Sequence, residues 1–375
     1  EMCTCGEVFQ FIRGIRWLTK KVDPIEYLSY AAIGTIADVS MIKGDNRIIV
    51  KHGLGPYALN HVVASGLSAI IEVCRIYNGH ITADDVSFKI APRINAAGRV
   101  STPMIAFKLL IERNWDQAEL LAEALNDYNN QRKDLQKNIS DKVIKNVSDN
   151  IENYKYGILV HDPDWHLGII GIVASRLVDK FRKPSVVIGS YNGKLKGSVR
   201  SFGNINIKEI LDNCSHLFEK YGGHKMAAGV TLKQECIDMA NDTFNEECKK
   251  YFKDERQESP LLYDAELKPE TISEETVNML TSKLYPYCAS INPDPIFLLS
   301  NVTLKGVELK EGKTWKMLKF KASKNGNDVE IPMSIFSQDF GTELDGMVAD
   351  IYFSFPQGSN TVNKWLNVID IVVKN

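Results

Sequence analysis

Between residues 116 and 150 the chain contains neither proline nor glycine, and this uninterrupted stretch constrains the fold more than any other feature. Within it, apolar residues recur at spacings of three and four with polar residues between them, at Ala118, Leu121, Leu125 and Tyr128. This periodicity is the apolar stripe of an amphipathic helix. The pattern therefore predicts one long helix over 116–150, which we expect to connect two domains.

The residues after this stretch alternate between short apolar runs and longer mixed segments. A strand is predicted at 156–160 (YGILV), a helix at 169–181 after the loop HDPDWHLG, and a second strand at 185–188. A strand, a crossover helix and a second strand within about thirty residues fit the length and order of a βαβ unit. Further elements are predicted as strands at 194–201 and 227–232, a helical segment near 207–221, and a polar linker, KDERQESP, at 253–260.

From residue 261 onward the texture changes to short runs in which apolar and polar residues alternate. Alternation with period two, interrupted by turn residues, is typical of a small antiparallel barrel. The predicted runs are 296–300, 302–309, 315–321, 329–335, 347–355 and 365–373, with turns at Glu311-Gly312 and Asn325-Gly326. We therefore expect an α/β chain in four parts: a first domain at 1–115, the connector helix at 116–150, an α/β domain at 151–252 and a barrel at 261–375.

Within the first part, Tyr27–Ala37 is a strongly apolar run that ends at Asp38, before a turn-rich KGDN and the apolar Ile48–Val50. Such a run is buried, so the carboxylate at its polar end should project from the edge of a core. Asp38 is the clearest candidate for a ligand of a hard metal ion. A helix-end cap is the alternative, because one carboxylate cannot hold the two ions of phosphodiester hydrolysis.

Charge is unevenly distributed along the chain. The net charge of −2 argues against indiscriminate binding to nucleic acid. However, residues 181–225 hold eight Lys and Arg against three acidic residues, and residues 303–324 hold seven against two. Charge separated in this way predicts either a basic channel on an acidic body or two solvated lysine-rich surfaces.

Neither membrane insertion nor secretion is indicated. No apolar run approaches the ~18–20 residues that cross a bilayer, and no signal sequence opens the chain. The seven cysteines are scattered, with only Cys3 and Cys5 close together. A CxC pair alone is weak support for a metal site, so free thiols in a reducing, cytoplasmic compartment are the expectation.

Two glycine-bearing segments in the basic window, GSVRS and GGHKMAAG, are candidates for a phosphate site. Ser198 and Arg200 are two residues apart on a predicted strand, so both face the same side, where a guanidinium fork and a hydroxyl can hold a phosphate. Gly222 and Gly223 allow the backbone at His224 to approach a ligand closely. Alone, His224 could be a core histidine and Arg200 a surface ion pair; two such segments in one window favour the site.

The segment Trp165-His166-Leu167-Gly168 precedes the predicted crossover helix. A helix N-terminus presents unpaired N–H groups that favour anions. Gly168, Gly171 and Ala174 follow at intervals of three, a smooth face on which another backbone can lie. Trp165 could stack on a base or fill the edge of the domain.

The segment PRINAAGR (92–99) carries two arginines and an asparagine with no acidic residue nearby. Arg93 and Arg99 are six residues apart, so we expect a loop shaped by Pro92 and Gly98 instead of a regular element. Arginines without acidic partners in such a loop fit contact with a phosphate backbone. Asn95 would belong to the same surface.

Taken in order, these segments resemble the RecJ family of the DHH/DHHA1 phosphoesterase superfamily. GTIADV resembles the family's fourth DHH motif, whose aspartate is a metal ligand, here Asp38. PRINAAGR resembles a signature late in the same domain, and LNDYNNQRKDLQ the start of the interdomain helix. DWHLGIIGIVASRL, GSVRS and GGHKMAAG look like the three DHHA1 motifs. The pattern after residue 260 fits the family's oligonucleotide-binding (OB) barrel, and NPDPIF (292–297) looks like the segment that leads into it.

The chain departs from the family at its start. The first three DHH motifs, which supply a DxD pair, a further Asp and an Asp-His-His triplet, are not in this sequence, and the DPD at 162–164 falls in the α/β domain. We therefore expect residues 1–115 to be the C-terminal part of a DHH domain. An omitted N-terminal part, a split gene and a natural truncation all account for the departure.

The resemblance implies a 5′→3′ exonuclease that degrades single-stranded DNA to mononucleotides in repair and recombination, with two Mn²⁺ or Mg²⁺ ions. It implies that Asp38 binds metal, that His224 donates to the scissile phosphate, and that Ser198 and Arg200, beside Gly222 and Gly223, hold the 5′ phosphate. The remaining implied contacts to the strand come from Arg93, Asn95, Arg99, Trp165 and His166, and on the barrel from Lys313, Lys316, Lys319 and Lys321 with Trp315 or Phe320.

A monomer is expected, with single-stranded DNA as substrate and a single-strand binding protein or helicase as partners. Two other functions stay open. One is a non-catalytic DNA-binding or replication-accessory protein, which the missing ligands suggest. The other is a phosphodiesterase for short oligonucleotides or cyclic dinucleotides, which shares a GGH motif. The barrel and PRINAAGR argue against the latter, because a dinucleotide is too short to need a second binding surface.

Overall fold

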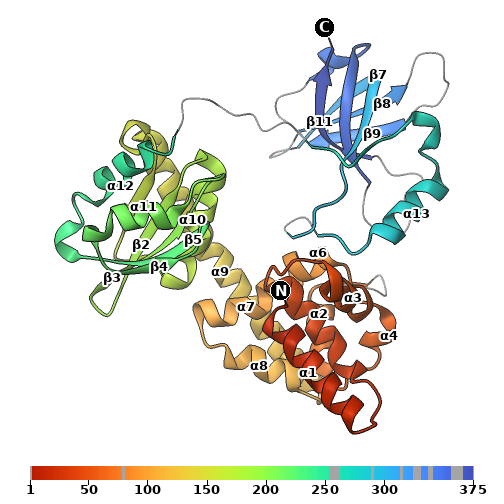
Figure 1. Ribbon diagram of the computed structural model, residues 1–375, viewed down its shortest axis with the longest axis horizontal. Helices are drawn as coiled ribbons and strands as arrows, with labels where there is room; N and C mark the ends of the chain where they lie inside the picture. The colour runs from red at the N-terminus through yellow and green to blue at the C-terminus, as the bar shows by residue number, and fades with distance from the viewer. Residues whose placement is uncertain are drawn as a thin grey trace. The chain divides into compact units, whose positions relative to one another are not determined.

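The computed structural model of the chain describes residues 2–77, 81–252, 262–288, 291–312, 316–323, 331–336, 341–355 and 366–374. These residues belong to two compact units, and Figure 1 labels their helices and strands. Unit 1 comprises Glu1–Val62, Asn78–Ser87 and Glu258–Asn375, and unit 2 comprises Val63–Tyr77 and Phe88–Gln257. Within the described ranges, no helix is both long and apolar enough to span a bilayer.

The first part of unit 1 is a cluster of helices around α2, Leu28–Ala37, which is the apolar run predicted to be buried. Asp38 follows as its C-cap. The turn predicted at KGDN is only partly present, because Gly44 already begins α3 and Asp45 suits the positive end of that helix. The elements of this part are α1 Thr4–Leu18, η1 Ile25–Tyr27, α3 Gly44–Gly53, α4 Pro56–Leu59 and α6 Ala83–Asp85, followed by η2 Val86–Ile90.

The second part of unit 1 is a closed five-stranded barrel in the order β7-β8-β9-β11-β10, with β10 pairing back to β7. Only β9 and β11 run parallel among these five, which is the arrangement of an OB-type fold. The predicted barrel is therefore confirmed. Its elements are β6 Ala265–Glu266, η6 Pro269–Thr271, α13 Glu274–Leu284, β7 Phe297–Glu311, β8 Lys316–Ser323, β9 Ile331–Phe336, η7 Thr342–Leu344, β10 Val348–Ser354 and β11 Leu366–Val373.

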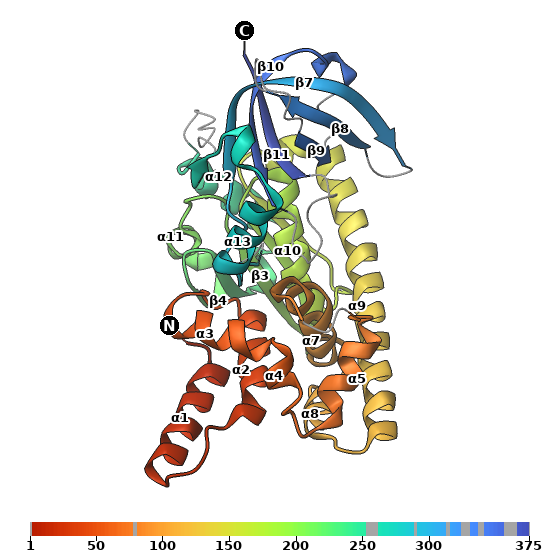
Figure 2. The same ribbon diagram turned by 90° about the vertical axis from the view of Figure 1, so that its right-hand side faces the viewer.

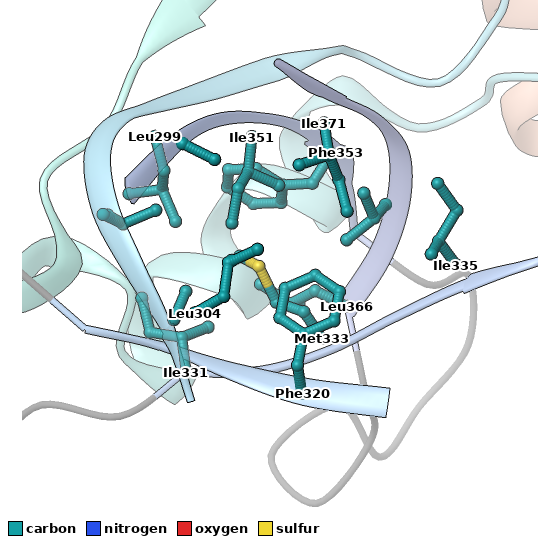
Figure 3. Close-up of a cluster of buried hydrophobic side chains, with 14 of the residues drawn as sticks. Leu299, Leu304, Phe320, Ile331, Met333, Ile335, Ile351, Phe353, Leu366 and Ile371 are labelled. Atoms are coloured by element: carbon teal, nitrogen blue, oxygen red, sulfur yellow. The ribbon is translucent and has the colours of Figure 1, made fainter. Parts of the chain in front are cut away.

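Two predicted runs, 296–300 and 302–309, form the single long strand β7. The strand bends because Asn301 and Gly306 have positive φ values of 53° and 60°, and its pairing with β8 shifts between Lys305 and Glu308. A bulge of this kind increases the local twist that closes a barrel. Alternate side chains then fill the interior, where Phe320, Met333 and Leu366 point toward one another (Figure 3).

One arginine ties the two parts of unit 1 together. The Arg47 Nη2 atom donates to the carbonyl oxygens of Lys283, Leu284 and Tyr285 at 3.2, 2.6 and 3.0 Å. These are carbonyls at the C-terminal end of α13, where a helix lacks internal donors and carries partial negative charge. The Tyr285 hydroxyl also donates to Ile81 O at 3.4 Å.

Unit 2 is organised along α9, Trp115–Asp149, which confirms the helix predicted over 116–150. Its N-terminal half contacts α5, α7 and α8, and its C-terminal half contributes Ile139, Val143 and Val147 to the core beneath α10 (Figure 2). The helices before it are α5 Ser65–Val73, α7 Ala91–Val100 and α8 Met104–Ile111. The predicted domain limits at 115, 150 and 252 remain predictions.

After α9 comes a five-stranded sheet in the order β1-β2-β3-β5-β4. β1 and β2 are parallel and joined by α10, as the βαβ prediction requires, and the other pairs are antiparallel. The elements are η3 Ile151–Tyr154, β1 Ile158–His161, α10 Leu167–Phe181, β2 Ser185–Tyr191, β3 Lys194–Arg200, α11 Ile207–Asn213, η4 Ser215–Leu217, β4 Phe218–Gly223, β5 Ala227–Leu232, η5 Gln234–Cys236 and α12 Ala240–Lys249.

The helical prediction near 207–221 was wrong in its second half. The helix α11 ends at Asn213, and Phe218–Gly223 is the edge strand β4. Phe218 is buried against the sheet core, so tertiary packing outweighs the weak helical pattern. The predicted linker at 253–260 and the turn at Asn325-Gly326 lie outside the described residues.

Candidate nucleic-acid interface

The two faces of the unit 2 sheet are covered differently. One face packs over its whole width against α11 and α12, with Val199, Ala228 and Val230 in that core. On the other face, the core formed with α9 and α10 includes strand residues of β1 and β2 alone, among them Ile158, Val160 and Val187. The helix α10 also packs against β3 on this side, at Ser198 and Arg200. We name the side of β3, β5 and β4 that faces away from α11 and α12 the open face.

Strand register places eight residues on the open face in three rows, and a backbone hydrogen bond places His224 at the end of the first row. Residues directly opposite each other in a sheet share a face, and so do residues two apart on one strand. Arg200 pairs with Ala227, whose carbonyl accepts the His224 amide at 2.8 Å. The second row pairs Ser198 with Gly229 and Gly229 with Gly222, and the third pairs Lys196 with Thr231 and Thr231 with Lys220.

The central strand β5 thus contributes only Ala227, Gly229 and Thr231 to the open face. Small residues in the middle, with longer ones on both sides, leave little side-chain volume over β5, and we name this strip the trough. The trough separates Arg200 from His224 by two strand spacings, about 10 Å. Lys196 and Lys220 stand on either side at its far end.

Ser198 and Arg200 form one hydrogen-bonded group, as the shared strand face predicted. The Arg200 Nη1 atom donates to Ser198 Oγ at 2.9 Å and to Val199 O at 2.8 Å. The pKa of Arg200 is lowered, first by burial and then by the nearby charge of Arg99. Neither Arg99 nor Arg200 forms an ion pair with a carboxylate of the described residues, so the positive charge is uncompensated by the protein there.

The helix α10 lies beside this group because glycines replace side chains at the contact. A Cβ on Gly171 would come within 3.1 Å of Ser198 Oγ and 3.3 Å of Arg200 Nη2. A Cβ on Gly168 would lie 2.3 Å from the carbonyl oxygen of Arg99, and Arg99 Nη1 donates to Gly168 O at 3.0 Å. The predicted smooth face of this helix therefore receives the backbone of α7 at Gly168.

The two adjacent glycines of the GGH segment have different roles. A Cβ on Gly223 would lie 2.4 Å from Ala227 O and from the Ala228 Cα atom, so the close approach of β5 requires glycine. A Cβ on Gly222 would meet no atom within 4 Å. Nothing in the described chain needs glycine at Gly222, which leaves its side of the trough open. His224 is exposed at the end of this strand.

The loop predicted for PRINAAGR was wrong, since residues 91–100 form the helix α7. The helix α7 continues directly from the π-helix η2, so Pro92 lies within a continuous helical run over 83–100. The two arginines leave α7 in different directions: Arg93 Nε donates to Asn126 Oδ1 at 3.0 Å, while Arg99 reaches α10. Asn95 is exposed and is not brought to the open face by any contact.

Sequence reasoning missed Arg132, which lies on α9 near Arg99. The pKa of Arg132 is lowered by burial and by the charge of Arg99. Its Nε atom donates to Asn129 Oδ1 at 3.2 Å and its Nη1 atom to Gln136 Oε1 at 3.0 Å. The NNQRKDLQ segment contains Arg132 without an adjacent acidic residue on its N-terminal side, but the segment was interpreted only as part of the connector helix.

At the start of α10, the exposed His166 is the N-cap, and its Nδ1 atom accepts from the Gly168 amide at 3.1 Å. Trp165 is half-buried and packs partly against the core beneath α10. It also lines a hollow of about 390 Å³ with His166, Tyr191 and Lys196. Both alternatives weighed for Trp165, a base platform and a filler of the domain edge, therefore have a structural basis.

In unit 1, the Asp38 carboxylate accepts from Ser40 Oγ at 3.0 Å. Among the described residues, no three or more His, Cys, Asp or Glu side chains are grouped so that they could hold a metal ion. The described residues therefore do not fit a two-ion centre, and we derive no hydrolytic step through metal. All seven cysteines are free thiols, and Cys3 caps α1 by accepting from the Gly6 amide.

The barrel residues proposed for strand contact have mixed outcomes. Phe320 cannot be a stacking platform, because it is 1% exposed and belongs to the barrel core. Lys316 is exposed and forms an ion pair with Glu311 at 3.1 Å. Lys321 is exposed and Lys319 half-buried on β8, whereas Lys313 and Trp315 lie outside the described residues.

Comparison with known proteins agrees with this architecture. Residues 152–250 match the DHHA1 domain family. The chain is 34% identical to the single-stranded-DNA-specific exonuclease RecJ of Bacillus subtilis, over 76% of this chain and 36% of that protein. It is also 34% identical to the Thermus thermophilus protein of the same name, over 77% of this chain and 41% of that one.

The structure matches the crystal structure of Thermus thermophilus RecJ in complex with Mn²⁺ with a TM-score of 0.78 and 27% identity, covering 97% of this chain and 52% of that chain. The sheet with its open face and the family match define a DHHA1-domain protein. Over most of its length, the chain is similar to RecJ proteins. It spans about a third to a half of the length of the curated RecJ proteins that it matches.

Proposed function

We propose that the open face holds the 5′-phosphorylated end of a single DNA strand, as part of a protein that removes nucleotides in the 5′→3′ direction. The observation that carries this proposal is the Ser198–Arg200 pair beside Arg99. Two guanidinium groups and a hydroxyl converge where the described residues supply no carboxylate. A terminal phosphate carries more charge than an internal one, so such a group favours a strand end.

Different residues are proposed to make different contacts with the strand. Arg200 presents donors in a fixed plane, and its bond to Ser198 holds that plane before the ligand arrives. His224, across the trough, would donate to a second phosphate of the same strand. Trp165, His166, Arg93 and Asn95 are proposed to contact the strand beyond its end, and Arg99 is proposed to add positive charge beside Arg200. Gly222 leaves its side of the trough open to the strand, and Gly223 allows β5 to approach β4 closely.

The comparisons support dependence on a divalent metal, because solved RecJ structures contain Mn²⁺ or Mg²⁺. We propose this dependence for the whole protein, with Asp38 as one ligand, although the described residues do not form such a site. What this chain would supply is the binding and orientation of the strand. Repair and recombination are the proposed context. A monomer and contact with a helicase or single-strand binding protein remain predictions.

The curated RecJ relatives are named as exonucleases for single-stranded DNA. We therefore do not favour a non-catalytic accessory protein or a phosphodiesterase for short oligonucleotides. The OB-type barrel is proposed as a second binding surface for a longer strand, since such barrels bind oligonucleotides.

The test is binding of the full chain to a fluorescent single strand, with a chelator present so that the strand stays intact. Wild type should bind a 5′-phosphorylated strand more tightly than the same strand with a 5′ hydroxyl. Arg200→Ala should reduce affinity for the phosphorylated strand by about 10- to 150-fold, the range for hydrogen bonds to charged groups, and remove the preference. Lys249→Ala, which deletes an exposed cation on α12, is the matched control. Equal loss on both strands in Arg200→Ala would contradict the proposal.

A further inference from the structure

The hollow of about 390 Å³ lies where β2 turns into β3, next to the start of α10. Its walls come from two segments. The segment before α10 supplies Pro163, Asp164, Trp165, His166 and Leu167, and the β2–β3 hairpin supplies Ser190, Tyr191 and Lys196. A hollow of this size, lined by aromatic and charged groups, falls in the range of small-ligand sites.

The two walls are fixed to each other by backbone contact. A Cβ on Gly189 would lie 2.4 Å from the carbonyl oxygen of Trp165, so the segment before α10 rests directly on β2. Gly189 pairs with Lys196 across the hairpin. The hairpin turns at Asn192 and Gly193, which both have positive φ, as a tight two-residue turn requires. Tyr191 and Lys196 are therefore held in place without help from a ligand.

Tyr191 is the unusual residue of the hollow. Its side chain is 55% exposed, so it contributes little to a core. Lys196 Nζ lies 5.1 Å from the centre of its ring, and Lys196 forms no ion pair with a carboxylate of the described residues. An aromatic ring beside an unpaired cation is the combination with which proteins bind single-stranded nucleic acid, stacking on a base while contacting its phosphate. Asp164, at the rim, could accept a hydrogen bond from a base N–H group.

The hollow shares Lys196 with the open face. Lys196, Ser198 and Arg200 lie on the same side of β3 at steps of two residues, about 6.6–6.8 Å each. That interval is comparable to the spacing of successive phosphates in a stretched single strand. A strand whose terminal phosphate sits at Ser198 and Arg200 can therefore follow β3 toward Lys196, which brings a nearby base to Tyr191.

We propose that this hollow is a nucleobase subsite, in which a base close to the strand end stacks on Tyr191 while Lys196 contacts the adjoining phosphate. The proposal rests on the proposed function, since it assumes that a strand end lies at Ser198 and Arg200. Stacking on a ring is tolerant of base identity. The subsite would therefore bind the base at a fixed distance from the strand end, whichever base it is.

The test uses the full chain and 5′-phosphorylated strands in which one of the first four nucleotides lacks its base. Wild type should lose roughly 5- to 100-fold in affinity at one position, the range for one lost stack. Tyr191→Ala should show the same loss with the intact strand and no further loss with the abasic one. Tyr191→Phe keeps the ring and should bind like wild type. Tyr77→Ala, at another exposed tyrosine of unit 2, is the matched control.

Lys196→Met should lower the slope of log affinity against log salt by about one, the contribution of a single phosphate contact. If wild type prefers the 5′ phosphate but Tyr191→Ala and the abasic losses simply add at every position, the subsite is overturned and the proposed function stands. If wild type has no preference for the 5′ phosphate and binds no strand, both proposals fail.

Discussion

The guanidinium of Arg99 donates to the carbonyl of Gly168 at 3.0 Å, and the carbonyl of Arg99 lies where a Cβ on Gly168 would be. These two contacts, one through the Arg99 side chain and one through its backbone, join α7 to α10. Gly168→Ala should therefore separate the two helices and destabilise unit 2 by ~1–3 kcal/mol, the usual cost of overpacking. Chemical denaturation of the variant measures this loss of unfolding free energy.

Gly98→Ala on α7 is the control: its Cβ would meet only Pro103 Cβ at 3.8 Å, so it should be neutral or slightly stabilising. Equal stability of both variants would contradict the contact.

The neighbouring Gly222 and Gly223 should separate function from stability. Gly223→Ala places a Cβ against the backbone of β5 and should lower the unfolding midpoint. Gly222→Ala projects into open space, so it should leave stability unchanged while weakening binding of a phosphorylated strand. Thermal unfolding and strand binding of both variants provide the measurement. Unaltered binding in Gly222→Ala would mean that the trough is not used.

Arg47 should stabilise unit 1 through the three carbonyls at the end of α13. Arg47→Met removes these charged hydrogen bonds, and we expect a loss of ~1–3 kcal/mol in the unfolding free energy of unit 1. Arg13→Met deletes an exposed ion pair with Asp23 and should cost little. Urea unfolding followed by circular dichroism would compare the two; similar small effects would argue that the carbonyl contacts are unimportant.

His161 should make stability depend on pH. Burial lowers its pKa below the ordinary value of 6.5, with the charge of Asp162 opposing the shift, and its Nε2 atom is buried without a hydrogen-bond partner. The unfolded chain then binds a proton more readily than the folded one, so stability is full above pH 6.5 and falls as pH decreases below it. His161→Asn should reduce the loss between pH 7 and pH 5. Parallel stability curves for variant and wild type would rule this out.

Local pattern was enough to predict several of the regular elements. The absence of Pro and Gly from 116–150 predicted α9, and apolar runs of the right length predicted β1, α10 and β2. Period-two alternation predicted the barrel. The Ser198–Arg200 contact also followed from spacing alone, because residues two apart on a strand share a face.

The failures occurred where distant contacts decide the outcome. The segment PRINAAGR was predicted to be a loop because its sequence does not show that α9 and α10 hold Arg93 and Arg99. Residues 218–223 form a strand because they pair with β5, which is not adjacent to them in the local pattern. Phe320 and Lys321 are adjacent in sequence, and only closure of the barrel decides which of them faces inward. The trough arises from the register of three strands, which no single segment contains.

The long helix α9 has a consequence for how related chains can diverge. Its two halves belong to different clusters of unit 2, and the bond between Arg99 and Gly168 closes a triangle with α7 and α10. Inserting one residue at its middle would rotate one half against the other by about 100° and lengthen that side by ~1.5 Å. The triangle would then no longer close, so α9 should tolerate substitution far better than any change in its length.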